Sequence, residues 1–279
     1  MATEIQTCYR HPDRRAGVSC QRCDRPICPA CMSSASVGFH CPECTRAGKQ
    51  KVYTARTLLT SRPLVTQILI GINVAVFLVG AASGGRAGVL FDGNNDLLVN
   101  GGLNAFAIAH NGEWWRIVTS GFLHFGIIHL GFNMYALWIL GNQLEAALGR
   151  WRYLACYAAA LVAGALGALI VSPNALTAGA SAAIYGLLGV AIAAQRSRGI
   201  SIWDTGLGGV LLINLFITFG ISNISIGGHL GGLAGGFVCG YLIYNLGPKI
   251  RNEAVVLAMC GAVAAGCFVA ALAVAQSAI

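Results

Sequence analysis

The sequence predicts an all-α polytopic membrane protein preceded by a small cysteine-rich region. Hydrophobic residues make up 56% of the 279 residues and charged residues only 10%, whereas a soluble domain carries about 25% charge. The polar residues are also unevenly distributed. Residues 1–62 contain ten of the eighteen Lys and Arg residues, and residues 1–44 contain seven of the eleven cysteines. The chain therefore divides into a polar head and an apolar body.

Seven apolar runs in the body are candidates for membrane spans, each of which needs about 20 mostly apolar residues. They cover residues 63–82, 119–141, 152–172, 181–195, 206–222, 227–246 and 254–276. The fourth run, of about 15 residues, covers only about 23 Å at 1.5 Å per residue, less than the roughly 30 Å hydrocarbon core. We therefore expect one of its ends to lie below the membrane surface.

The basic residues of the short turns predict the orientation. With seven spans, three turns fall on one side and carry six basic residues, namely Arg150, Arg152, Arg196, Arg198, Lys249 and Arg251. The opposite turns, SPNALTAG and SNIS, carry none. The head is therefore expected in the cytoplasm and the C-terminus outside, in a multi-pass protein of a bacterial cell membrane.

The long connection 83–118 is expected to form a structured loop at the membrane interface. Its segment GEWWRIV contains two tryptophans, and tryptophan is enriched at the boundary between lipid and water.

Polar side chains gather in the outer halves of three predicted spans. The second, fourth and sixth spans all run inward, and the polar residues in their first halves are His124, His129, Asn133, Ser181 and His229. Ionisable groups inside a membrane are costly and point to function. We expect these five side chains to converge.

Small residues predict that the fourth and sixth spans approach closely. Gly232 and Gly236 share a helix face with His229 and form a small-xxx-small pattern. The fourth span offers Gly179, Ala180, Ala182, Gly186 and Gly189 in return. Close backbones would bring Ser181 within hydrogen-bonding distance of His229.

This arrangement suits acyl transfer. His229 would take the hydroxyl proton of Ser181 as general base and return it to the leaving amine. The outer halves of the spans contain no Asp or Glu to orient the histidine, so a dyad is expected. His129 and Asn133, four residues apart, and the free N–H groups at the start of the fourth helix would stabilise the oxyanion.

Each residue also has a simpler interpretation. A serine in a membrane helix usually serves packing, a membrane histidine can bind metal or relay protons, and His129 with Asn133 can bridge helices. The alternative function is a non-catalytic scaffold or transporter. A metal transporter would be expected to have acidic ligands within its spans, and the seven predicted spans contain no Asp or Glu. The joint placement on one side of three helices favours catalysis.

Five motifs resemble those of the rhomboid family of intramembrane serine proteases. They are WWR (114–116), HFGIIHLGFN (124–133), GNQLEAALG (141–149), GASA (179–182) and GHLGGLAGG (228–236), which follow the family's order over about residues 63–246. The resemblance implies a core of six transmembrane helices around a hydrated cavity, with the seventh span as an accessory helix. It also implies cleavage of transmembrane helices near their outer ends.

The resemblance assigns roles to individual residues. Ser181 is the implied nucleophile and His229 the implied base, with Tyr185 packed against the His229 ring. His129, Asn133 and the Ser181 backbone N–H form the implied oxyanion hole, which His124 supports. Arg116 and Glu145 match structural positions of the first loop and its junction. The family often has glycine after the serine, where this chain has Ala182, so we expect an effect on rate rather than on mechanism.

The head has the spacing of a double zinc site. It reads C-x2-H, C-x2-C, C-x2-C and C-x2-C between residues 8 and 44, and each such pair can hold one metal from a tight turn. Disulfides are the alternative, but a reducing cytoplasm and an odd number of cysteines favour zinc. We expect two structural zinc ions and no cofactor for catalysis.

A cross-braced order of the ligand pairs would resemble the B-box type of zinc finger, except that CPEC (41–44) replaces its final histidine pair. One site would use Cys8, His11, Cys28 and Cys31, and the other Cys20, Cys23, Cys41 and Cys44, with His40 as a substitute for a neighbour. The expected domains are the zinc region 1–45, a basic linker 46–62, the core 63–246 and the last helix 247–279. The head would bind a cytoplasmic protein, and its excess positive charge suits anionic lipid more simply than nucleic acid.

Overall fold

The structure is a computed structural model that describes residues 6–35, 37–47, 63–83, 95–222 and 224–278. The chain divides into two compact units, Met1–Leu58 and Leu59–Ile279, and we describe each by itself. The predicted linker 46–62 lies outside the described residues except for its first two.

The N-terminal unit consists of short hairpins, so the prediction of an all-α protein holds for the body alone. Strands β1 (Thr7–Cys8) and β2 (His11–Arg15) pair, as do β3 (Val18–Ser19) with β4 (Pro26–Ile27) and β5 (Ser33–Ser34) with β6 (Phe39–His40), all antiparallel. A short turn of helix, η1 (Pro29–Cys31), and α1 (Pro42–Ala47) complete the unit. Its buried residues are five cysteines and Ile27. So small a core rarely folds without a metal.

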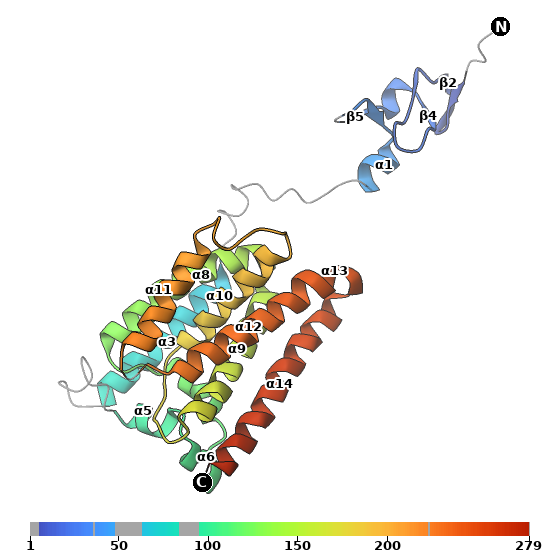
Figure 1. Cartoon of the computed structure of the whole chain (residues 1–279). Coiled ribbons are helices and arrows are strands. Elements are labelled where there is room, and N and C mark those ends of the chain that lie inside the picture. Colours follow the sequence, from blue (N-terminus) through green and yellow to red (C-terminus); the bar gives the residue numbers. More distant parts are fainter. Residues whose placement is uncertain (1–5, 36, 48–62, 84–94, 223, 279) are drawn as a thin grey trace. The chain divides into compact units, whose positions relative to one another are not determined.

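The second unit is helical, and its helices run side by side (Figure 1). The long helices are α3 (Leu64–Ser83), α8 (Ile127–Leu148), α9 (Arg150–Val171), α10 (Ser181–Arg196), α11 (Leu207–Gly220), α12 (Ile226–Tyr241) and α14 (Glu253–Ser277). Shorter elements connect them, namely α5 (Asp96–Gly101), α6 (Ala105–Asn111), α7 (Arg116–Thr119), η2 (Ser120–Phe122), the π-helical turn η3 (Leu242–Leu246) and α13 (Gly247–Ile250). The ordered connection predicted between the first two spans is present as α5, α6 and α7.

Several helices are long and apolar enough to cross a membrane. Among the described residues these are α3, α9, the continuous stretch Ile226–Ile250, and α14, and a fifth span results if α7–η2 and α8 count together. Helix α11 is apolar but shorter. The chain is a multi-pass membrane protein, and the full set of seven crossings stays a prediction.

The second predicted span, 119–141, is wrong in its limits. Residues 116–122 form a separate helical segment at 90° to α8, and α8 begins at Ile127 and continues to Leu148. The break coincides with Gly126, whose φ of 98° is readily adopted by glycine but strained for other residues. His124 therefore lies in the bend before α8 and not in its first half.

Helices α9, α10 and α12 pack with their backbones in close contact. A side chain at Gly236 would meet the carbonyl group of Gly186, and one at Gly232 would meet that of Ala182. The predicted approach of the fourth and sixth spans is therefore confirmed. A second close approach, between Gly167 of α9 and Gly227 of α12, was not predicted.

Two charged side chains hold the first connection and its junction in place. The Arg116 guanidinium donates to the carbonyl groups of Val99 and Gly102, both at 2.7 Å, and pairs with Glu113. The Glu145 carboxylate accepts hydrogen bonds from the backbone N–H groups of Val65 (2.9 Å) and Thr66 (2.8 Å), in the first turn of α3. Both contacts agree with the structural roles expected for Arg116 and Glu145.

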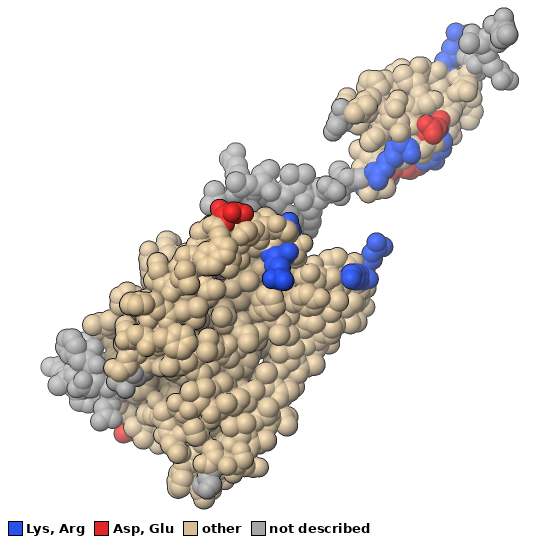
Figure 2. All heavy atoms as spheres, in the orientation of Figure 1, with Lys and Arg blue, Asp and Glu red and all other residues tan. Residues whose placement is uncertain are grey.

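The basic side chains of the three short turns gather at one end of the bundle (Figure 2). Arg152 of α9 lies 3.5 Å from Glu253 at the start of α14, and the Arg198 guanidinium lies 5.5 Å from the Tyr244 ring. These contacts bring the three predicted basic turns to the same end.

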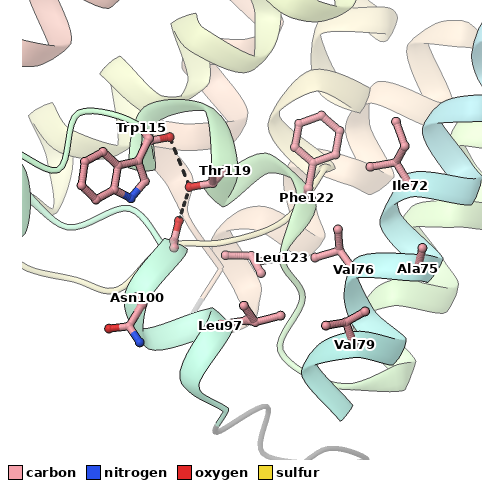
Figure 3. A pocket seen from close by; sticks show the side chains of 11 residues that line it. Ile72, Ala75, Val76, Val79, Leu97, Asn100, Trp115, Thr119, Phe122 and Leu123 are labelled. Atoms are coloured by element: carbon pink, nitrogen blue, oxygen red, sulfur yellow. Dashed lines mark hydrogen bonds between the residues drawn. The ribbon is translucent and has the colours of Figure 1, made fainter. Parts of the chain in front are cut away.

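A cavity of about 550 Å³ lies between α3, α5 and η2 (Figure 3). Its walls are mostly apolar and include Ile72, Val76, Leu97 and Phe122. Neither Ser181 nor His229 lines it.

Candidate active site and metal centres

Ser181 and His229 meet where α10 and α12 begin. Ser181 is the first residue of α10, and His229 lies in the first turn of α12. The Ser181 Oγ is 2.9 Å from the His229 Nε2, although 48 residues separate them. The glycine contacts between the two helices make this distance attainable. His229 is buried and Ser181 is half-buried, so the serine is the more accessible of the two.

Tyr185 packs against the His229 ring, as the resemblance implies. The two rings are stacked at 3.9 Å between centroids with an interplanar angle of 17°. Tyr185 is one helical turn after Ser181 on the same face of α10. Its ring therefore limits the rotation of the imidazole while Nε2 faces Ser181.

The sequence analysis missed Thr218, which contacts the other side of His229. The Thr218 Oγ1 lies 2.8 Å from the His229 Nδ1 and 2.5 Å from the Tyr185 hydroxyl. Thr218 is 1% exposed and comes from α11. A single threonine in an apolar run carries no motif, so the sequence gives no signal for its role.

His129 is oriented towards the serine. Its Nδ1 accepts a hydrogen bond from the backbone N–H of Phe125 at 3.3 Å, so the neutral ring carries its proton on Nε2. The His129 Nε2 and the Ser181 Oγ border the same small space beside Gly179. A Cβ placed on Gly179 would lie 3.0 Å from that Nε2 and 3.6 Å from that Oγ. An N–H donor therefore faces the space beside the serine.

Asn133 and His124 complete the predicted polar group. The Asn133 amide donates to the His129 carbonyl at 2.9 Å, which leaves its second N–H for another acceptor. The His124 ring meets that of His129 edge-on at 5.0 Å. His124 is buried, and neither of its ring nitrogens has a hydrogen-bond partner among the described residues.

Comparison with known proteins assigns the chain to a family. The Rhomboid domain matches residues 111–246. The rhomboid protease GluP of Bacillus subtilis is 34% identical over 192 residues, which are 68% of this chain and 36% of GluP. YdcA, a further rhomboid protein of Bacillus subtilis, is 36% identical over 136 residues, 47% of this chain and 68% of YdcA. The chain belongs to the rhomboid family.

The rhomboid match covers the helices that carry the polar group. Ser181, His229, His129, Asn133 and Thr218 all lie within residues 111–246. The cysteine-rich unit, α3 and α14 lie outside that range. Rhomboid-like protease 1 of Toxoplasma gondii is 31% identical over 158 residues, 54% of each chain. This chain thus spans only about a third of GluP and about half of the Toxoplasma relative.

The N-terminal unit of this rhomboid contains two clusters that fit metal ions. One contains Cys8, His11, Cys28 and Cys31, and the other Cys20, Cys23, Cys41 and Cys44. These are the two cross-braced sets predicted from the spacing, and His40 belongs to neither cluster. Strand pairing of β1 with β2 brings the first cysteine beside the histidine.

The distances between ligand atoms match tetrahedral zinc. Zinc bonds of about 2.3 Å to sulfur and 2.0 Å to nitrogen place neighbouring ligands about 3.5–3.8 Å apart. The His11 Nδ1 lies 3.8, 3.5 and 3.3 Å from the sulfurs of Cys8, Cys28 and Cys31. In the other cluster the sulfurs of Cys23 and Cys41 are 3.8 Å apart. All four positions are occupied by protein, which is the pattern of a structural site.

Backbone N–H groups favour the thiolate form of Cys20, the form in which a cysteine binds zinc. Burial acts to raise the pKa of the Cys20 thiol, but backbone N–H groups led by that of Cys41 outweigh it and lower the pKa to about 6. The Arg25 guanidinium donates to the Cys23 sulfur at 3.3 Å. Four thiolates around Zn²⁺ would carry two negative charges in all, and this arginine would partly neutralise them.

Proposed function

We propose that this rhomboid is a serine endopeptidase that cleaves membrane-protein helices through a Ser181–His229 dyad. The observation that carries the proposal is the 2.9 Å contact between Ser181 Oγ and His229 Nε2 across α10 and α12. A serine that serves only helix packing would not be expected to have an imidazole within hydrogen-bonding distance. Two further features suit acyl transfer. The His229 ring is held in place by stacking on Tyr185, and His129 offers an N–H donor for the oxyanion.

The reaction begins with transfer of the Ser181 proton to His229 Nε2. The hydroxyl oxygen then bonds to the substrate carbonyl carbon, and the carbonyl oxygen becomes an oxyanion. His129 Nε2–H, an Asn133 N–H and the Ser181 backbone N–H would donate to that oxygen, with the positive end of α10 beside it. His229 returns the proton to the leaving amine. Water, deprotonated by His229, then releases the acyl group from Ser181.

The site would lie on the outer side of a membrane. The body's basic turns gather at the end opposite to Ser181 along α10, and basic turns favour the cytoplasmic side. In this orientation the N-terminal unit would lie in the cytoplasm and the C-terminus outside, with seven crossings in all. The substrate would be a transmembrane helix that unwinds near its outer end, where small residues lower the cost of leaving the helix.

The zinc unit would bind a cytoplasmic protein. Its two closed ligand sets leave no position for a substrate at the metal, so its zinc ions hold the fold rather than catalyse. The proposed domains remain the zinc region 1–45, the linker 46–62, the rhomboid core 63–246 and an accessory helix in 247–279.

Cleavage of a single-span peptide in liposomes tests the proposal. The probe is a fluorogenic transmembrane peptide with glycine and alanine near its outer end. Wild type should cleave it, while Ser181→Ala and His229→Ala should lose at least about 1,000-fold in rate. Thermal unfolding should be unchanged in Ser181→Ala. Equal cleavage by Ser181→Ala would favour the alternative, a non-catalytic scaffold or transporter.

A further inference from the structure

We infer that Thr218 is a positioning residue that fixes which nitrogen of His229 carries the proton. The effect of Thr218 on the cleavage rate rests on the proposed function. The position of the proton on His229 does not. It concerns a hydrogen-bonded group formed by Thr218, Tyr185, His229 and the backbone carbonyl of Asn214.

Four short pairs of atoms make up this group. The Thr218 Oγ1 lies 2.8 Å from the His229 Nδ1, 2.8 Å from the Asn214 carbonyl oxygen and 2.5 Å from the Tyr185 hydroxyl oxygen. The Tyr185 hydroxyl oxygen lies 2.6 Å from the same carbonyl oxygen. Thr218 and Tyr185 each bring one hydrogen, and the carbonyl brings none. The protonation of Nδ1 decides how these hydrogens can be shared.

If Nδ1 carries a hydrogen, the group is well satisfied. The imidazole donates to Thr218, the Thr218 hydroxyl donates to the Asn214 carbonyl, and Tyr185 donates to one of its two neighbours. One short pair is then left without a hydrogen. If Nδ1 is bare, Thr218 must donate to it, and two short oxygen pairs are left without one. Close oxygen pairs without a hydrogen repel each other, and buried polar groups are rarely left unpaired.

The favoured arrangement leaves Nε2 as the acceptor that faces Ser181. A neutral imidazole has one hydrogen, so a proton on Nδ1 makes Nε2 the base. When Nε2 takes the Ser181 proton, the imidazolium keeps donating Nδ1–H to Thr218. The hydroxyl thus occupies the position that a carboxylate holds in a serine triad, though it carries no charge.

Thr218 also links its own contact with the imidazole to that of Tyr185, because its hydroxyl lies beside the Tyr185 hydroxyl. Tyr185 stacks on the ring face and Thr218 binds the ring edge, and both contact the Asn214 carbonyl. In α11 only Gly208 and Thr218 are buried. Thr218 is therefore the main polar tie between α11 and the dyad.

The tautomer of His229 in the resting wild-type protein tests the inference without any change at Thr218. In full-length protein with ¹⁵N-labelled histidine, the His229 signals are assigned by their loss in His229→Gln. We expect a protonated Nδ1 and a bare Nε2 at neutral pH. A neutral His229 with its proton on Nε2 would overturn the inference, whatever the protein cleaves.

A pair of variants at the same position gives the kinetic test. Thr218→Ser keeps the hydroxyl and should keep both the tautomer and the rate. Thr218→Val has a similar shape and leaves Tyr185 bonded to the Asn214 carbonyl, but it removes the acceptor for Nδ1–H. We expect kcat on the fluorogenic single-span peptide to fall roughly 10- to 100-fold with KM unchanged, and the Nδ1-protonated signal to weaken.

The outcomes separate this inference from the proposed function. A wild-type protein that cleaves in a Ser181-dependent way, with Thr218→Val as fast as Thr218→Ser, would overturn the role of Thr218 alone. Absence of Ser181-dependent cleavage would overturn the proposed function, and the tautomer measurement would then decide the inference.

Discussion

At the scale of single residues, polar side chains between the helices have two kinds of role in this rhomboid. Ser181, His229 and Thr218 form a bonded series that is suited to proton transfer. Glu145 instead serves the fold, because its carboxylate receives two backbone N–H groups and the Thr66 hydroxyl at the start of α3. The first N–H groups of a helix have no partner within it, and inside a membrane no water replaces one.

Replacing Glu145 tests this capping role. Glu145→Gln keeps the size but turns one acceptor oxygen into an NH₂ group that faces N–H donors. We expect a loss of about 1–3 kcal/mol in the free energy of unfolding, measured by thermal or denaturant unfolding in detergent. Glu253→Gln is the control, because its pair with Arg152 is exposed and worth little. Equal stability of the two variants would contradict the assignment.

At the scale of elements, the contact between α10 and α12 sets the distance between Ser181 and His229, the proposed dyad. The glycines Gly232 and Gly236 lie one and two turns after His229, against the backbones of Ala182 and Gly186. Any side chain there would push the two helices apart, and the serine and histidine are carried on those helices.

A single added methyl group tests that dependence. Gly236→Ala places its Cβ against the Gly186 carbonyl, so we expect roughly 100-fold slower cleavage, since a displacement of about 1 Å has that cost. Gly261→Ala in α14 is the matched control, because nothing lies within 4 Å of its added Cβ. Rates are measured on the same fluorogenic peptide. If Gly236→Ala were as active as Gly261→Ala, close packing would not be what positions the dyad.

The elements also show what sequence reasoning could and could not reach. Ser181 and His229 could be paired because topology places them at the same depth and glycines bring their helices together. The limits of α8 could not be read, because Leu123 and Phe125 carry the hydrophobic pattern on into Ile127. The bend depends on the backbone at Gly126. Thr218 was missed because its role depends on the rotation of α11, which one isolated threonine does not reveal.

At the scale of the whole molecule, a cysteine-rich unit with two candidate metal sites and a membrane unit belong to one chain. The ligand spacing predicted the four ligand pairs of the head, because each pair lies in a tight local turn. The order in which the pairs combine depends on how the hairpins fold together, and the structure groups them in the cross-braced order.

Zinc stoichiometry tests this grouping. Wild-type protein should bind two zinc ions per chain, measured by elemental analysis after gel filtration. The double variant Cys8→Ser with Cys31→Ser alters one cluster and should keep one zinc. The double variant Cys8→Ser with Cys44→Ser alters both and should keep none. Cys260→Ser, a buried cysteine of α14, is the control and should keep two. Equal zinc content in the two double variants would contradict the grouping.

The membrane unit should still cleave its substrate when the N-terminal unit is lost, because Ser181 and His229 both lie within residues 59–279.

The most direct test of the central claim is covalent labelling of the full chain with a fluorophosphonate, followed by peptide mass analysis. The account predicts one adduct on Ser181 in wild type and none in Ser181→Ala, with labelling of His229→Ala slowed at least about 1,000-fold. An adduct on another residue, or labelling of His229→Ala at the wild-type rate, would contradict it.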